Sequence, residues 1–222
     1  MDGLFVFEGA TDFVNFCADR PMLSSWGIWP LGLEERAKKL TGNKYFKEFK
    51  EKFSGNDIFK YEVSDKEVVS WLDSIYLMYN VFYDSELNKY LDKDTKIIME
   101  YPIPFSNNKR VDYIIQKGNK VLIIECGMIF STKDLRKVYK KKINETIVYK
   151  ELISNFTSLD MKLGVYSMIY LPEYQLEGGI NSKHMDINMD NSIRFQMFIE
   201  EFFNLKEKNT NILPQFSIED FE

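Results

Sequence analysis

A hairpin is encoded in residues 109–127, KRVDYIIQKGNKVLIIECG, where two β-branched runs flank a short polar turn. Gly118-Asn119 is the two-residue signal that suits the positive φ angles of a tight hairpin turn. Pairing counted outward from that turn places Asp112 directly opposite Glu125. Alternate residues of a strand share one face, so both carboxylates are predicted to lie on the same face of the sheet.

This carboxylate pair is the main candidate for chemistry. Directly opposed carboxylates lie roughly 5 Å apart at Cβ and repel each other unless a cation sits between them. Mg²⁺ or Mn²⁺ accepts such oxygen ligands and activates water beside a phosphate, so Asp112 and Glu125 are candidate metal ligands. Glu100, on the preceding predicted strand, would assist if that strand neighbours the hairpin. Two other interpretations stay open: a pair bound by neighbouring lysine or arginine, and the remnant of a dead metal site.

The sequence around the hairpin alternates between strand and helix patterns. Apolar runs predict strands over 97–103 and 163–171, and helical spacing predicts a long helix opened by residues 131–134 and a final helix over 192–205. A strand that follows a helix can return parallel to its neighbour, whereas the hairpin is antiparallel. The order predicts an α/β fold with a mixed central sheet flanked by helices.

The N-terminal part has a different character. We predict a helical region over 1–94, packed on an α/β core that spans 95–222. Within it, helical spacing indicates two short helices over 33–53, and a capping box over residues 64–67 opens an amphipathic helix. Residues 1–30 show no sustained period and stay unassigned.

Composition narrows the possible functions. With 29 Lys and Arg against 34 Asp and Glu, the net charge is -5, so any binding of nucleic acid must be local. Cys17, Cys126 and the single histidine, His184, exclude a disulfide framework, a Cys-rich zinc site and any site that needs two imidazoles. We expect Cys126 on the face opposite Glu125 and His184 in a surface loop. The sequence shows neither a signal peptide nor a membrane span, so we expect a cytoplasmic protein with no membrane partner.

The order of motifs resembles the catalytic core of the PD-(D/E)xK nuclease superfamily, in particular the restriction-endonuclease-like domains that precede some helicase domains. Residues 100–104 match E-Y-x-x-P, residues 110–112 match R-x-D, residues 123–125 match I-x-E, and residues 149–152 partly match Y-K-x-x-L. The similarity covers residues 96–172.

The resemblance implies a restriction-endonuclease-like core that hydrolyses phosphodiester bonds with Mg²⁺ or Mn²⁺. Asp112 and Glu125 would then hold the metal, with support from Glu100. The implied partners are a nucleic acid, DNA rather than RNA, and a protein such as a helicase or ATPase subunit. Such nucleases act in prokaryotic or phage genome defence or repair.

One position departs from the family pattern. Gly127 stands where the family has the lysine of E-x-K. We expect a lysine from the following helix, which offers Lys133, Lys137, Lys140, Lys141 and Lys142, to replace it, with Lys141 or Lys137 as first choices, and Glu145 as a supporting residue. The cations expected to bind nucleic acid are Lys109, Arg110, Lys133 and Lys140. The alternative is a catalytically degenerate nuclease fold that serves as a nucleic-acid-binding or assembly subunit.

Overall fold

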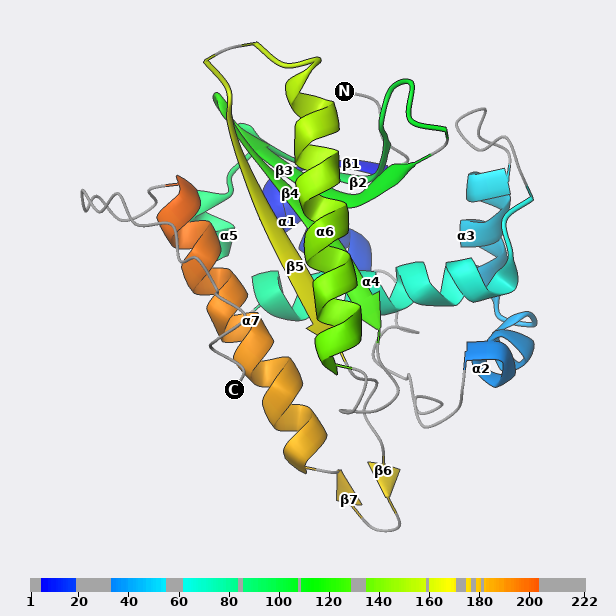
Figure 1. The fold of residues 1–222 in the computed structure, drawn as a ribbon. Helices are drawn as coiled ribbons and strands as arrows, with labels where there is room; N and C mark the ends of the chain where they lie inside the picture. The colour runs from blue at the N-terminus through cyan, green and yellow to red at the C-terminus, as the bar shows by residue number, and fades with distance from the viewer. Residues whose placement is uncertain are drawn as a thin grey trace.

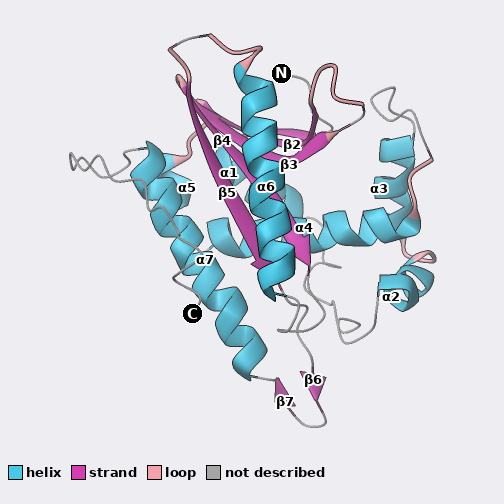
Figure 2. Ribbon diagram, viewed as in Figure 1, coloured by secondary structure: helices cyan, strands magenta, loops and turns pink. Residues whose placement is uncertain are grey.

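A five-stranded sheet is covered by helices on both faces (Figures 1 and 2). The computed structural model describes residues 5–18, 33–54, 62–83, 86–107, 109–128, 135–158, 160–170, 175–176, 179–180 and 182–203. The strands of the sheet, in spatial order, are β1 (Phe5–Glu8), β2 (Thr95–Pro102), β3 (Arg110–Lys117), β4 (Lys120–Met128) and β5 (Lys162–Tyr170).

The helices flank this sheet, and two very short strands form a separate pair. The helices are α1 (Gly9–Ala18), α2 (Leu33–Leu40), α3 (Lys44–Ser54), α4 (Asp65–Tyr83), α5 (Leu87–Tyr90), α6 (Leu135–Ser154) and α7 (Ser182–Phe203). The separate pair consists of β6 (Gln175–Leu176) and β7 (Gly179–Ile180). None of the helices in the described parts of the chain combines the length and apolar character of a membrane span.

The sheet is mixed, as predicted for an α/β fold. Neighbouring strands from β1 to β4 are antiparallel, and β5 runs parallel to β4 after the crossover through α6. The predicted hairpin register is confirmed, because Ile114 pairs with Ile123 and Lys117 pairs with Lys120. Gly118 has a φ of +57° at the turn, which a residue without Cβ adopts at little cost.

The edge strand β1 falls within the segment that the sequence pattern left unassigned. Its four residues alternate between buried and exposed, and Phe5 pairs with Met99 of β2. A strand this short gives almost no periodic signal. The region predicted as helical therefore also contributes a strand. Gly9 follows with a φ of +84°, and a Cβ there would lie 2.5 Å from the carbonyl oxygen of Asp92.

The helix predictions differ in accuracy along the chain. The capping box is confirmed: the Ser64 N–H donates to Glu67 Oε2 at 3.0 Å, and the Glu67 N–H donates to Ser64 Oγ at 3.3 Å. The two short helices predicted over 33–53 are α2 and α3. The final helix begins at Ser182, ten residues before its predicted start, so His184 lies in α7 and not in a loop.

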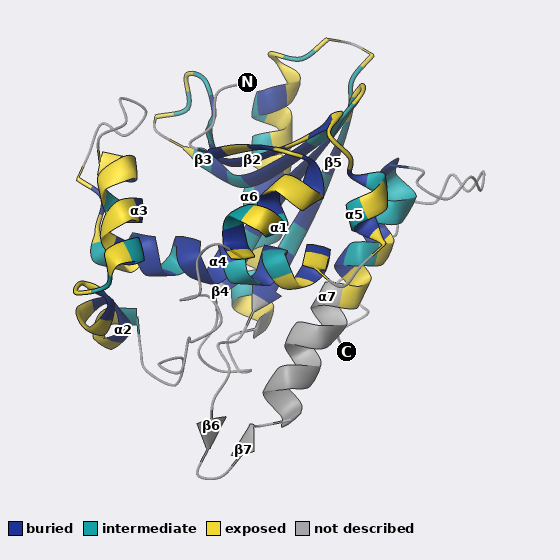
Figure 3. Cartoon of the chain, turned by 180° about the vertical axis from the view of Figure 1, so that it is seen from behind, coloured by how far each residue is buried: buried dark blue, intermediate teal, exposed yellow. Residues whose placement is uncertain are grey.

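The two faces of the sheet carry separate hydrophobic cores. On one face, α6 packs over Ile98, Ile114 and Ile123 through Ile153. On the other face, α1, α4 and α7 pack over a larger core that includes Met99. Figure 3 shows the largely buried α4 running across this second face. The carboxylates of the hairpin lie on the α6 side of the sheet, next to α4, where β3 begins and β4 ends.

Candidate functional site

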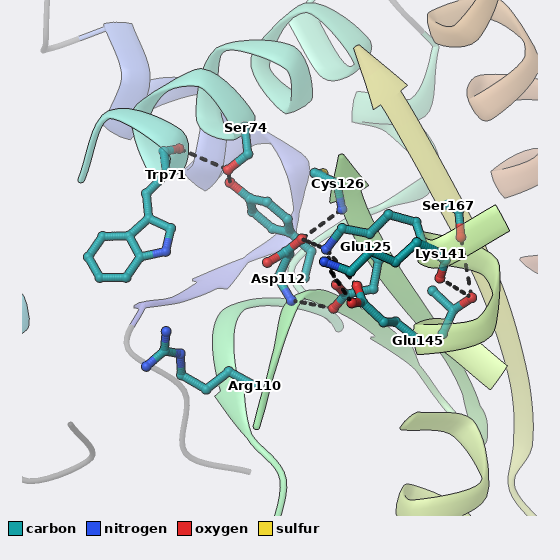
Figure 4. A network of polar contacts seen from close by, with 12 residues as sticks. Trp71, Ser74, Arg110, Asp112, Glu125, Cys126, Lys141, Glu145 and Ser167 are labelled. Carbon is teal, nitrogen blue, oxygen red and sulfur yellow. Dashed lines mark hydrogen bonds and ion pairs between the residues drawn. The ribbon is translucent and has the colours of Figure 1, made fainter. Parts of the chain in front are cut away.

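A polar cavity of about 300 Å³ lies between α4, the β2–β3–β4 strands and α6. Its lining is dominated by charged groups: Glu67, Glu100, Arg110, Asp112, Glu125 and Lys142. Figure 4 shows Asp112, Glu125 and Glu145 close together beside α6, with Trp71 and Arg110 on the other side of Asp112. The cavity therefore gathers residues from five elements around the predicted carboxylate pair.

Asp112 and Glu125 are fixed by each other's strand. The backbone N–H of Asp112 donates to Glu125 Oε1 at 3.1 Å, and the N–H of Cys126 donates to Asp112 Oδ2 at 2.7 Å. The backbone pairing of β3 with β4 runs to Tyr113 and Ile124, and beyond this point the carboxylates take the amide hydrogens. The backbone hydrogen-bond ladder between β3 and β4 therefore ends here, and the freed amide hydrogens hold the two carboxylates in place.

Lys142 of α6 is the cation that reaches this pair. Its Nζ lies 2.8 Å from Glu125 Oε2, 3.9 Å from Asp112 Oδ2 and 3.0 Å from Glu145 Oε2. Gly127 makes room for it, because a Cβ at that position would lie 3.0 Å from Lys142 Cγ and 2.7 Å from Ile169 Cδ1. A lysine from the next helix therefore lies over the position where the E-x-K pattern would have its lysine.

Among the contacts of the described residues, neither of the predicted first choices, Lys141 and Lys137, pairs with Asp112 or Glu125. Both are exposed, and Lys141 forms only a surface pair with Glu145 at 3.6 Å. Successive residues of a helix point about 100° apart. Lys142 therefore lies in the inward row with the buried Thr146, whereas Lys141 and Lys137 point away from that row. Thr146 itself contacts Ser167 of β5 through the two hydroxyl oxygens, 3.2 Å apart. This contact sets the rotation of α6 over the sheet.

Glu100 lies beside the pair, as expected if β2 neighbours the hairpin. Register pairs run from Met99 with Tyr113 directly to Tyr101 with Val111, and Glu100 between them has a φ of +53°. A left-handed glutamate costs on the order of 1–3 kcal/mol and persists only where its surroundings hold it. The holding contact comes from Arg110, whose Nε donates to Glu100 Oε2 at 2.8 Å. Glu100 is thereby bound to arginine.

The residues predicted to bind nucleic acid differ in exposure. Lys109 and Lys140 are exposed, and Lys133 lies outside the described residues. Arg110 is largely enclosed, since its guanidinium contacts Glu100, lies 3.5 Å from Glu67 Oε1, and stacks 5.9 Å from the ring centre of Trp71. The structure therefore makes Arg110 an internal counterion.

Two residues that line the cavity, Glu67 and Trp71, were not predicted for it, and Lys142 was only one of several candidate lysines on its helix. The helical spacing indicates that Lys142 points toward the sheet, because it falls in phase with the inward positions of its helix. Glu67 was assigned only as a capping residue, and Trp71 lies one helical turn after it on α4. Nothing in the local pattern shows that α4 crosses the sheet beside this site. Cys126 lines the cavity and packs with the core on the α4 side, the face predicted for it.

Burial and mutual repulsion raise the pKa values of the acidic groups in the cavity. Burial, together with the negative charge of Asp112, raises the pKa of Glu125 to about 8, although Lys142 opposes this. Burial also raises the pKa of Asp112, against the attraction of Lys142. The pKa of Glu100 is raised well above its usual range by burial and by Asp112. For Lys142, the two carboxylates outweigh its burial and raise the pKa, so the amine stays protonated at neutral pH.

Glu125 should make the stability of the metal-free protein depend on pH. Its pKa rises from 4.5 to about 8 on folding, so keeping it ionised in the folded state costs free energy as pH increases. Relative to Glu125→Gln, the wild-type unfolding free energy should fall between about pH 5 and pH 8, by at most about 1.4 kcal/mol per unit, and level off above. Urea titrations in EDTA at several pH values measure the difference, and parallel curves would contradict the burial of an ionisable Glu125.

The donor set fits a hard divalent cation. Mg²⁺ takes one or two carboxylates and completes its shell with water and phosphate oxygens. Asp112 and Glu125 supply two carboxylates, and a bound cation would offset the cost of burial that raises both of their pKa values. Within the described residues, no group of three or more His, Cys, Asp or Glu side chains forms a ready-made metal site. Any metal here would thus depend on this pair, water and substrate.

The arrangement joins two carboxylates and a protonated lysine around a cavity of about 300 Å³. Such a set can hold a cation, bind a phosphate oxygen on Lys142 and place a water between them. No family model, curated protein or solved structure matches this chain, and the function of the site therefore has to be argued from its geometry.

Proposed function

We propose that the protein is a divalent-metal-dependent nuclease of the PD-(D/E)xK type, in which α6 supplies the lysine. The observation that carries the proposal is the contact of Lys142 with Asp112 and Glu125 over Gly127. The strand order and the crossover through α6 agree with a restriction-endonuclease-like core. In this proposal Asp112 and Glu125 hold Mg²⁺ or Mn²⁺.

The residues divide the work of phosphodiester hydrolysis. A water oxygen attacks phosphorus in line, and the bond to the leaving sugar oxygen breaks. A metal held by the two carboxylates would lower the pKa of a bound water and offset charge on the phosphate. Lys142 stays protonated, so it stabilises negative charge on a phosphate oxygen and does not remove a proton from water. Glu145, 3.0 Å from the amine, orients Lys142.

Arg110 and Glu100 support this centre from the β2 side. The arginine lies 2.8 Å from Glu100 and 3.5 Å from Glu67. Its positive charge therefore offsets the negative charge that these carboxylates would add beside Asp112 and Glu125. The substrate class that suits the site is a nucleic acid, DNA in preference to RNA. The exposed lysines Lys109 and Lys140 offer phosphate contacts on a protein whose net charge is negative.

Cleavage and metal binding can be tested separately. Purified protein should cleave DNA in Mg²⁺ or Mn²⁺ and not in EDTA. At Mn²⁺ concentrations about 100 times the dissociation constant, the melting temperature should rise by about 5–10 °C. Glu125→Gln should abolish that rise, and the exposed-site control Glu51→Gln should keep it. A metal-dependent rise that persists in Glu125→Gln would contradict the proposed ligand.

A degenerate nuclease fold is the second candidate, favoured by the closeness of Lys142 to both carboxylates. Its ammonium already lies 2.8 Å from Glu125 and 3.9 Å from Asp112, as in an internal ion cluster. Such a protein would serve as a nucleic-acid-binding or assembly subunit. It predicts neither cleavage nor a Mn²⁺-dependent rise in melting temperature, so the same two measurements separate the candidates.

A further inference from the structure

Two phenylalanine rings lie together on the surface near the site. Phe105, in the loop between β2 and β3, is 96% exposed, and Phe156, just after α6, is 51% exposed. Their ring centres are 5.8 Å apart, and their planes are inclined by 33°. Exposed aromatic side chains of this size are costly in water, and two that face one another form a ready surface for another flat apolar group.

The loop that carries Phe105 is built to hold it outward. Phe105 has a φ of +57° and Asn107 a φ of +54°, a conformation that bulky residues rarely adopt. Ser106 Oγ donates to the carbonyl oxygen of Ile103 at 2.6 Å, and the Ile103 N–H donates to the Lys109 carbonyl at 2.9 Å. These bonds close the loop on itself, so the exposed ring belongs to a defined conformation.

The loop that carries Phe105 leads along the chain to the proposed site. Lys109, at the end of the same loop, places its Nζ 5.9 Å from the ring centre of Tyr149. Tyr149 lines the cavity that contains Asp112 and Glu125. An exposed cation and a tyrosine therefore stand between this loop and the carboxylates. This alternation of aromatic rings and positive charge matches the alternation of bases and phosphates in a nucleic-acid strand.

We propose that Phe105 and Phe156 stack a nucleobase of a single-stranded nucleic acid whose backbone passes Lys109 into the site. This inference rests on the proposed nuclease function and adds the strandedness of its substrate. Bases in a duplex are stacked within the helix, whereas an unpaired base can leave its strand and lie on an aromatic side chain. The neighbouring cation favours a nucleic acid over an apolar protein partner as the ligand of the pair.

Binding without cleavage tests the proposal. Fluorescence anisotropy in EDTA, with a short labelled poly(dT) strand, gives the dissociation constant of the full chain. Phe105→Ala and Phe156→Ala should each weaken binding about tenfold or more, because aromatic stacking contributes on this scale. Phe105→Trp should restore it. The control Met197→Ala removes an exposed apolar side chain on α7, at the other face of the sheet, and should bind as the wild type does.

The outcomes separate the two proposals. No binding by the wild type, equal binding by the alanine variants, or the same loss with a matched duplex would overturn the stacking role. Equal binding by those variants would instead assign the pair to a protein contact. If the wild type binds the single strand through these rings but cleaves nothing in Mg²⁺ or Mn²⁺, the nuclease function fails and the stacking surface stands.

Discussion

Replacing Asp112 with asparagine should reduce metal-dependent cleavage about 1000-fold or more. The substitution removes one of two carboxylates proposed to hold the metal, and metal stabilisation of the transition state amounts to several kcal/mol. Each 1.36 kcal/mol is a tenfold change in rate. Initial rates on a labelled DNA strand, measured over a range of Mg²⁺ concentrations, give the comparison with the wild type.

The fold should survive this change. Asp112 Oδ2 accepts a hydrogen bond from the Cys126 N–H at 2.7 Å, and an asparagine oxygen can accept the same bond. The matched control Asp94→Asn alters an exposed aspartate and should leave the rate unchanged. Cleavage by Asp112→Asn at the wild-type rate, with an unchanged melting curve, would remove the carboxylate pair from the mechanism.

Local pattern was sufficient to predict the hairpin and the pairing of its carboxylates. The turn at Gly118 sets the register, and the alternation of side chains then fixes which residues share a face. The mixed sheet follows from the long helix between β4 and β5. The hairpin depends on residues close together in the sequence, whereas β4 and β5 pair in parallel across the crossover through α6, as Lys120 does with Lys162.

Contacts between segments that are distant in the sequence were harder to predict. The edge strand β1 is too short for a periodic signal, and its position depends on pairing with β2, some ninety residues later. The left-handed φ of Glu100 depends on Arg110 and on the skipped register pair, which composition does not encode. The preference for Lys141 had a different cause. The helical phase distinguishes it from Lys142, which lies in the inward row of Thr146 and Ile153.

Lys142 allows the sharpest test of where the catalytic cation comes from. Lys142→Ala should lower the cleavage rate about 100- to 1000-fold, the usual loss for one group that stabilises developing charge. Lys141→Ala, one residue away and 73% exposed at its side chain, should stay within about twofold because its side chain contacts only Glu145 at the surface. Equal losses in the two variants would mean that α6 supplies general positive charge and no specific cation.

A lysine can also be introduced at 127, the position of the lysine in the E-x-K pattern that the sequence resembles. In the wild type, a side chain at 127 would collide with Lys142 Cγ and Ile169 Cδ1, so Gly127→Lys alone should destabilise the protein. In the double variant with Lys142→Ala, the first obstacle is gone, and Ile169→Val removes the second. The backbone at 127 is not left-handed, so a lysine there needs no strained φ, and only Val138 Cγ1, 3.1 Å from the added Cβ, must shift by a few tenths of an ångström. Recovery of cleavage in this background would show that the two positions deliver an ammonium to the same carboxylates. A stable, folded triple variant that stays inactive would mean that Lys142 acts from α6 in a way that position 127 cannot reproduce.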